Sequence, residues 1–207
     1  MIKAKKLGFR AIAERDLPLL ADWLNDDEMS GLVVGRSYPV SLEQQRRWFE
    51  RQLGDEHNQR WMVETFEGQT VGLTGLWSID YVNRNALTAL KIGAKDVQGK
   101  GYGSDAIMGL MAYAFGEVGL ERLWGEILVY NVPSYKAYVE RCGWKVEGLL
   151  RKQVFRAGTF HDVLRVGILR EDFLALPAAA DYITRPSEAR VEISAKHSAL
   201  PTVGSGR

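Results

Sequence analysis

Helical spacing of apolar residues marks four segments of the chain. In residues 14–25 the leucines and one alanine recur every three or four positions, which predicts an amphipathic helix. Ser41 and Gln44 match a capping box, the signal that opens a helix, and the polar residues 42–53 follow it. Residues 104–118 predict a third helix, and Pro133 and Ser134 open a fourth that Gly143 would end.

Segments rich in β-branched and aromatic residues lie between these helices and are separated by short polar turns, which predicts strands. The expected strands are residues 6–12, 60–67, 70–80, 86–92, 123–130, 144–155 and 159–169. Residues 25–39 read as a loop, and from residue 176 the periodicity is lost. We therefore expect one domain over residues 1–175 and a flexible tail over residues 176–207.

The composition is that of an ordinary globular domain, with 207 residues, 46% hydrophobic and 26% charged. A net charge of +1 gives no reason to expect a nucleic acid or an anionic membrane as partner. The lone cysteine, Cys142, excludes an internal disulfide and fits no metal-ligand spacing, so we expect no metal. No apolar run approaches the roughly 20 residues of a membrane span, and we expect a cytoplasmic protein.

A glycine-rich stretch, VQGKGYG at residues 97–103, joins a predicted strand to a predicted helix. A Walker phosphate loop needs Ser or Thr after Gly-Lys, but Lys100 precedes Gly101, and the dinucleotide fingerprint needs GxGxxG rather than GxGxG. Two interpretations remain for the loop alone. Its amides and the helix start could converge on an anion such as pyrophosphate, or the loop could be a tight connection without a ligand.

The chain resembles the GNAT superfamily of N-acetyltransferases when this loop is taken with the later N-x-x-S-x-x-x-Y-x-x-x-x-G-W at residues 131–144. The usual signature has one residue fewer between the tyrosine and the glycine. Residues 60–86 and residues 148–172, which include the RxGxxxD hairpin at residues 156–162, are similar to the RimJ/RimL branch, which is related to spermidine acetyltransferases. The resemblance covers residues 7–174.

This resemblance implies an α/β GNAT fold, in which a mixed, mostly antiparallel sheet of about seven strands splays between strands 4 and 5 beside about four helices. It also implies acetyl-CoA as the acetyl donor. Loop amides would hold the pyrophosphate, and the main chain at residues 91–93 would pair with pantetheine. The cofactor-binding residues implied are Lys91, Ile92, Gly93, Gln98, Gly99, Lys100, Gly101, Tyr102, Gly103, Ser104, Asn131 and Ser134.

Tyr138 matches the family's general acid, which protonates the departing thiolate, although core packing beside Tyr135 is an alternative interpretation. An amine of pKa near 10 must also lose a proton before it attacks. Relatives often carry a glutamate in the fourth strand for this step, but Thr88 stands at that position. Four other carboxylates remain open as the proton acceptor: Glu64, Asp80, Glu126 and Asp162.

The resemblance favours a small-molecule primary amine over a protein as the acceptor, and Thr88 weakens a polyamine assignment. A protein N-terminal or lysine acetyltransferase remains an alternative, as does a catalytically weak acyl-CoA-binding regulator. The acceptor side of relatives corresponds to segments that carry Trp23, Tyr38, Trp48 and Trp77, so these residues either bind a partly apolar amine or pack in the core. A homodimer is compatible with the sequence.

Overall fold

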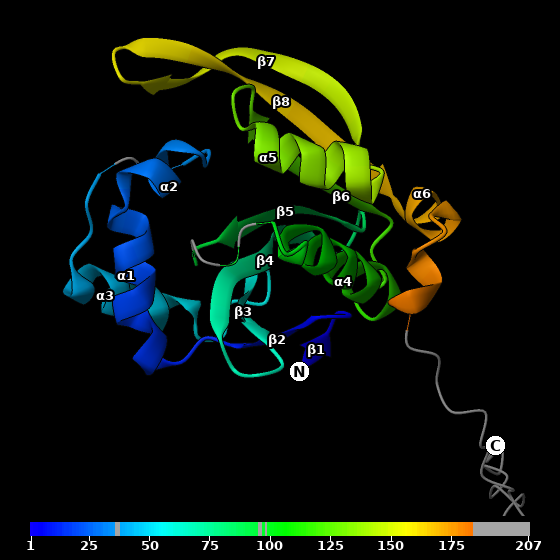
Figure 1. Cartoon of the computed structure of the whole chain (residues 1–207), viewed down its shortest axis with the longest axis horizontal. Helices are drawn as coiled ribbons and strands as arrows, with labels where there is room; N and C mark the ends of the chain where they lie inside the picture. Colours follow the sequence, from blue (N-terminus) through cyan, green and yellow to red (C-terminus); the bar gives the residue numbers. More distant parts are fainter. Residues whose placement is uncertain (36–37, 95–96, 98, 184–207) are drawn as a thin grey trace, which may run out of the picture.

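One mixed sheet organises the protein, and helices cover both of its faces (Figure 1). The computed structural model describes residues 1–35, 38–94, 97 and 99–183. Within these residues no helix is long and apolar enough to cross a bilayer. The strands are β1 (Ile2–Lys3), β2 (Leu7–Ala11), β3 (Gln59–Thr65), β4 (Thr70–Asp80), β5 (Asn85–Ile92), β6 (Arg122–Leu128), β7 (Lys145–Arg156) and β8 (Thr159–Leu169).

The sheet has the order β1-β2-β3-β4-β5-β6-β8-β7, and every neighbouring pair is antiparallel except β5 and β6. The mixed, mostly antiparallel α/β sheet is therefore confirmed. Its eight strands exceed the expected number because the two-residue strand β1 pairs with β2 at the edge. So short a segment carries too little periodicity to be predicted from sequence.

The longer helices lie in the segments where the sequence predicts them, although α1 begins at Leu17 and α4 at Tyr102 rather than at residues 14 and 104. Ser41 caps α3 as expected: its main-chain N–H donates to Gln44 Oε1 at 2.8 Å, and its hydroxyl accepts from Gln44 N at 3.2 Å. The helices are η1 (Glu14–Asp16), α1 (Leu17–Asn25), α2 (Asp27–Gly31), α3 (Leu42–Gln52), α4 (Tyr102–Gly116), α5 (Val132–Tyr135), η3 (Lys136–Arg141), α6 (Arg170–Ala175) and η4 (Ala179–Asp181).

The expectation of an unbroken loop over residues 25–39 is wrong at its start. Residues 27–31 form α2, and the Asp26 carboxylate caps it by accepting a hydrogen bond from Met29 N at 2.9 Å. Helix α6 was also missed. Both are short, and capping and tertiary contacts stabilise such helices more than their own hydrophobic pattern does.

Alternating residues of the strands serve two separate cores. Val63 on β3 belongs to the larger core, which includes α4, whereas its neighbour Met62 packs with Leu17, Leu20 and Trp23 of α1. Successive side chains on a strand point to opposite faces, which explains the division. We call these the α4 face and the α1 face of the sheet.

Strands β5 and β6 part after a short parallel ladder. Their partners are Asn85 with Arg122, Ala86 with Leu123, and Leu87 with Trp124, after which the pairing stops. Beyond that point β5 remains paired with β4, and β6 remains paired with β8. The predicted splay between the family's fourth and fifth strands is therefore confirmed.

The packed domain continues past residue 175, where the sequence suggested a boundary. Ala179 is buried in the larger core, and the Tyr182 hydroxyl donates to Asp105 Oδ1 on α4 at 2.8 Å. The Asp105 carboxylate also accepts hydrogen bonds from the main-chain N–H groups of Lys5 and Lys6. Residues 176–183 therefore pack against the domain, and residues 184–207 lie outside the described part.

A partly buried ionic cluster connects β2 with β3 and with helix η1. Arg10 Nη1 lies 2.7 Å from Asp16 Oδ2, and Arg10 Nε lies 2.8 Å from Glu64 Oε1. Burial acts to raise the pKa of Asp16, but hydrogen bonds from Arg10 and the Ala13 N–H outweigh it and hold that pKa below its usual value. The cluster ties β2, β3 and the start of α1 together.

We expect Arg10→Met to lower the free energy of unfolding by about 3–5 kcal/mol at pH 7, because it leaves two poorly solvated carboxylates without their cation. The exposed pair Arg47 and Glu43 supplies the control, and Arg47→Met should cost less than about 1 kcal/mol. Urea unfolding curves measure both.

Because the folded pKa of Asp16 is depressed, its stabilisation is present above the unfolded pKa and is lost as pH falls through the folded pKa. The Arg10 effect should therefore shrink below about pH 4, and an undiminished effect there would contradict the assignment.

Candidate active site

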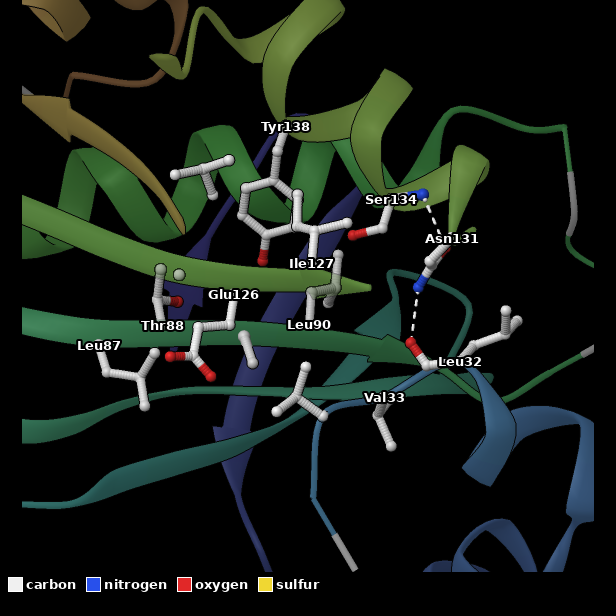
Figure 2. Close-up of a pocket in the computed structure, with 14 residues that line it drawn as sticks. Leu32, Val33, Leu87, Thr88, Leu90, Glu126, Ile127, Asn131, Ser134 and Tyr138 are labelled. Carbon is white, nitrogen blue, oxygen red and sulfur yellow. Dashed lines mark hydrogen bonds between the residues drawn. The ribbon is translucent and has the colours of Figure 1, made fainter. Parts of the chain in front are cut away.

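The gap between β5 and β6 contains a cavity of about 130 Å³ (Figure 2). Its walls come from the two parting strands, the start of α5, the π-helix η3 and a segment that follows α2. Principal lining residues are Leu32, Val33, Leu87, Thr88, Leu90, Glu126, Ile127, Asn131, Ser134 and Tyr138. Three residues that the sequence assigned to the site, Asn131, Ser134 and Tyr138, therefore meet at one cavity.

Tyr138 points into this cavity from η3 (Figure 2). Its side chain is 6% exposed, and its hydroxyl is buried without a hydrogen-bond partner among the described residues. Burial raises the pKa of the phenol well above its usual value. The ring packs edge-on against Trp144 with centroids 4.9 Å apart, which fixes its direction. The core-packing interpretation thus accounts for the ring but not for the unpaired hydroxyl.

The backbone around Tyr138 accounts for the extra residue before the glycine. Residues 136–141 form a π-helix, in which each main-chain hydrogen bond spans one residue more than in an α-helix. Gly143 ends the helix with a φ of 75°, and Trp144 N donates to Tyr138 O at 3.1 Å. The predicted glycine cap is confirmed. The extra residue between Tyr138 and Gly143 therefore falls where the helix is a π-helix.

Asn131 has two structural contacts at the edge of the cavity. Its side-chain oxygen accepts from Ser134 N at 3.1 Å and so caps α5, while its Nδ2 donates to Leu32 O at 2.7 Å (Figure 2). Ser134 lines the same cavity one turn later. Asn131 therefore links the start of α5 to the segment after α2.

The glycine loop has the backbone shape that glycine permits. Gly99 and Gly101 both have φ of 79°, and Gly101 immediately precedes α4. Lys6 Nζ donates to Lys100 O at 3.1 Å, and Tyr102, Gly103 and Ser104 form the first turn of α4. Left-handed backbone followed by free helical N–H groups suits an anion. Gln98, also assigned to this loop, lies outside the described residues.

The end of β5 corrects part of the pantetheine assignment. Gly93 N donates to Val71 O at 2.8 Å, so this amide belongs to the ladder with β4. The main-chain groups of successive residues point to alternate edges of a strand. The N–H and C=O of Lys91 therefore also face β4, whereas the N–H and C=O of Ile92 face the gap. Gly93 has a different role, because a Cβ there would overlap the Trp23 indole.

The structure separates the four candidate proton acceptors. Glu64 pairs with Arg10, Asp80 accepts hydrogen bonds within its own turn, and Asp162 Oδ1 accepts from Lys152 N at 2.7 Å. Among these four, Glu126 lines the cavity (Figure 2), and its Oε1 lies 2.9 Å from Arg165 Nη2. No group of three or more His, Cys, Asp or Glu residues in the described part of the chain is arranged to hold a metal ion.

Glu126 and Tyr138 approach the gap from opposite faces of the sheet. Ile127, next to Glu126 on β6, belongs with Tyr138 to the core on the α4 face. Alternation along β6 therefore turns Glu126 toward the α1 face. Thr88 shares the face of its buried neighbour Ala86, and its hydroxyl donates to Gly75 O at 2.9 Å.

The segment Ser30–Gly35, which we call the covering segment, lies across the cavity. Arg156 at the end of β7 donates to Ser30 O, to Val33 O at 2.8 Å and to Gly35 O at 3.1 Å. The Tyr130 hydroxyl donates to Gly31 O at 2.8 Å. The sequence marked Arg156 as the start of a hairpin motif but gave no sign of these contacts, which join residues more than a hundred positions apart in the chain.

A sheet that parts to form a cavity between strands β5 and β6, with a glycine turn leading into the next helix, is the arrangement found in acetyltransferases of the GNAT class. Residues 6–145 match the acetyltransferase (GNAT) domain family. The chain belongs to this family, and it is a GNAT N-acetyltransferase.

The names of similar proteins state different acceptors. The chain is similar to spermidine N(1)-acetyltransferase of Vibrio cholerae, with 27% identity over 82% of this chain and 96% of that protein. A crystal structure of spermidine N-acetyltransferase from Vibrio cholerae in complex with CoA and spermine superposes with a TM-score of 0.77, covering 82% of this chain and 98% of that one. A putative ribosomal N-acetyltransferase, YdaF of Bacillus subtilis, is 33% identical over 52% of this chain and 58% of its own length.

The contacts of Arg156 predict that it restrains the covering segment. Arg156→Ala removes the donor shared by Ser30, Val33 and Gly35, so amide hydrogen exchange in residues 30–35 should quicken by about tenfold or more. Arg151→Ala, on the same strand and exposed, is the matched control and should leave that exchange unchanged. Equal exchange in the Arg156 variant and the wild type would show that other contacts hold the segment.

Proposed function

We propose that the protein transfers the acetyl group of acetyl-CoA to a primary amine of a small molecule, by direct attack within a ternary complex. The observation that carries this proposal is the buried hydroxyl of Tyr138, which lacks a partner and points into the gap between β5 and β6. A buried polar group without a partner costs free energy, so a functional partner in the bound state is the simplest account.

Tyr138 is the general acid in this mechanism. As the C–S bond of the thioester breaks, its phenol donates a proton to the departing sulfur, and coenzyme A leaves as a thiol. The phenol carries its proton at neutral pH, but burial raises its pKa and so makes it a weaker acid. Proton transfer therefore depends on the departing sulfur being held within hydrogen-bond reach of the hydroxyl. Ser134 and Asn131 flank the same wall of the cavity and would contact the donor molecule.

Glu126 is the proton acceptor on the other face. The amine nitrogen forms the new C–N bond with the acetyl carbon, and the proton that the amine loses passes to the Glu126 carboxylate directly or through water. Arg165 Nη2 lies 2.9 Å from Oε1 of this carboxylate and orients it. Acid and base thus reach the reacting carbon from opposite sides of the gap.

Backbone groups supply the remaining functions. The N–H of Ile92 faces the gap and would stabilise the negative oxygen that forms on the acetyl carbonyl. Left-handed turns at Gly99 and Gly101, followed by α4, would hold the pyrophosphate of the donor. Lys91 and Gly93 are removed from this set because their main-chain groups face β4.

Cys142 does not offer a competing covalent route. Its thiol is buried beside Ser104 O, 3.6 Å away, and burial raises its pKa to about 12. A thiol that stays protonated is a poor nucleophile. This supports direct transfer to the amine rather than an acyl-cysteine intermediate.

The covering segment favours a small acceptor over a protein. Residues 32–34 line the cavity at the gap, and hydrogen bonds from Arg156, Tyr130 and Asn131 hold their surroundings in place. A peptide substrate needs an open groove, whereas this segment closes one side of the gap. A protein acceptor would require the segment to move away.

Acetyl-CoA-dependent thiol release, measured against a panel of small amines and an N-terminal peptide, tests the proposal. We expect turnover with a small amine, and Tyr138→Phe should lower kcat by about a hundredfold while KM for acetyl-CoA changes little. Tyr135→Phe, three residues away on the same helical stretch, is the control and should retain the wild-type kcat. Tight coenzyme binding without turnover of any amine would refute the enzyme assignment, and an unchanged kcat in Tyr138→Phe would refute the acid role.

Substitution of Glu126 should produce a pH-dependent defect. We expect Glu126→Gln to lower kcat/KM by about a hundredfold at pH 7 and to recover part of the loss toward pH 10, where the free amine becomes abundant. Glu121→Gln removes an exposed, ion-paired carboxylate just before β6 and should leave the pH–rate profile unchanged. A profile for Glu126→Gln that runs parallel to the wild type would assign the proton to another acceptor.

A further inference from the structure

A second cavity, of about 310 Å³, adjoins the gap on the α1 face of the sheet. We call it the tryptophan pocket because Trp23 of α1, Trp48 of α3 and Trp77 of β4 line it. The residues Val33, Val34, Ala89 and Leu90 line both this pocket and the cavity at the gap. The two cavities are therefore adjacent, and the tryptophan pocket lies on the face toward which Glu126 points.

The tryptophan side chains are held by specific contacts. Trp23 lies against Gly93, where no larger residue would fit, and Trp77 sits opposite Leu87 across the β4–β5 ladder. Trp48 and Trp77 are only partly buried, so their rings are available to a ligand. Core packing therefore explains Trp23 better than it explains the other two.

Positive charge surrounds this pocket. The guanidinium of Arg60 lies 5.8 Å from the Trp48 ring centre and 5.4 Å from that of Trp77, within cation–π range of both. Lys91 lines the pocket and donates from Nζ to Trp23 O at 3.3 Å. Burial acts to lower the pKa of Lys91. Two cations are thus already placed beside the aromatic walls.

Acidic groups do not balance these cations inside the pocket. None of the described residues that line it is Asp or Glu. The acid whose charge acts on Lys91 is Asp26, and its carboxylate is engaged in capping α2. A polyamine would bring further ammonium groups into a site without carboxylates to bind them, which is unfavourable.

We infer that the tryptophan pocket is the acceptor site and selects a primary amine carried on a flat, apolar, aromatic body with a single positive charge, in preference to a polyamine. Its aromatic walls match such a body, and its volume is within the range of small-ligand pockets. The amino group would extend past Ala89 and Leu90 into the gap, toward Glu126. This inference rests on the proposed function and specifies its acceptor.

The test compares 2-phenylethylamine and tryptamine with spermidine, by kcat/KM for thiol release from acetyl-CoA at one pH. We expect the aromatic amines to be favoured by about tenfold to a hundredfold. Trp77→Leu and Trp48→Leu should each remove most of this preference without changing KM for acetyl-CoA. Trp61→Leu is the matched control: Trp61 is a partly buried tryptophan of β3 that packs with Tyr113 on the α4 face, and its substitution should retain the preference.

Direct binding provides a second readout that does not need turnover. Titration of the protein loaded with coenzyme A should show binding of 2-phenylethylamine at least tenfold tighter than binding of spermidine, and the difference should vanish in Trp77→Leu. Spermidine that is turned over or bound as well as 2-phenylethylamine would overturn the inference while leaving the proposed acetyl transfer intact. Failure to bind coenzyme A, or to release thiol with any amine, would instead refute the proposed function.

Discussion

The separation of β5 and β6 determines where every other part of the site lies. Each strand keeps one hydrogen-bonded neighbour and turns its other edge toward the gap, so a row of main-chain polar groups is left for a ligand to satisfy. Tyr138 reaches this gap from the α4 face, Glu126 from the α1 face, and the covering segment lies across it. Without the separation, these groups would lie on two sides of a closed sheet.

Local sequence signals were sufficient for most of the scaffold. The capping box at Ser41, the glycine at residue 143 and the alternating strands each act over a few residues, and each appears where expected. Short elements were missed for the opposite reason. Helix α2 depends on a cap at Asp26 and on contacts made far along the chain, and a five-residue segment carries little periodicity of its own.

The sequence motif indicated residues that lie together at the gap, but not how all of them are oriented. Asn131, Ser134 and Tyr138 meet at one cavity as the motif implied. Which edge of β5 faces the gap depends on register, and the ladder bond from Gly93 N to Val71 O shows that its amide faces β4. The role of Arg156 depends on a hairpin folding back over α2, which no local pattern encodes. That Glu126, among the four carboxylates, lines the cavity likewise depends on the fold.

Thr88 and Glu126 both line the gap, but they lie on opposite faces of the sheet. Its side chain lies in the buried interior on the same face as Tyr138, and its hydroxyl is already bound to Gly75 O. A glutamate introduced there would place a charge in an apolar interior, on the face opposite to the α1 side from which Glu126 reaches the gap. Strand β5 carries no carboxylate, so among the described lining residues the acidic side chain at the gap comes from β6.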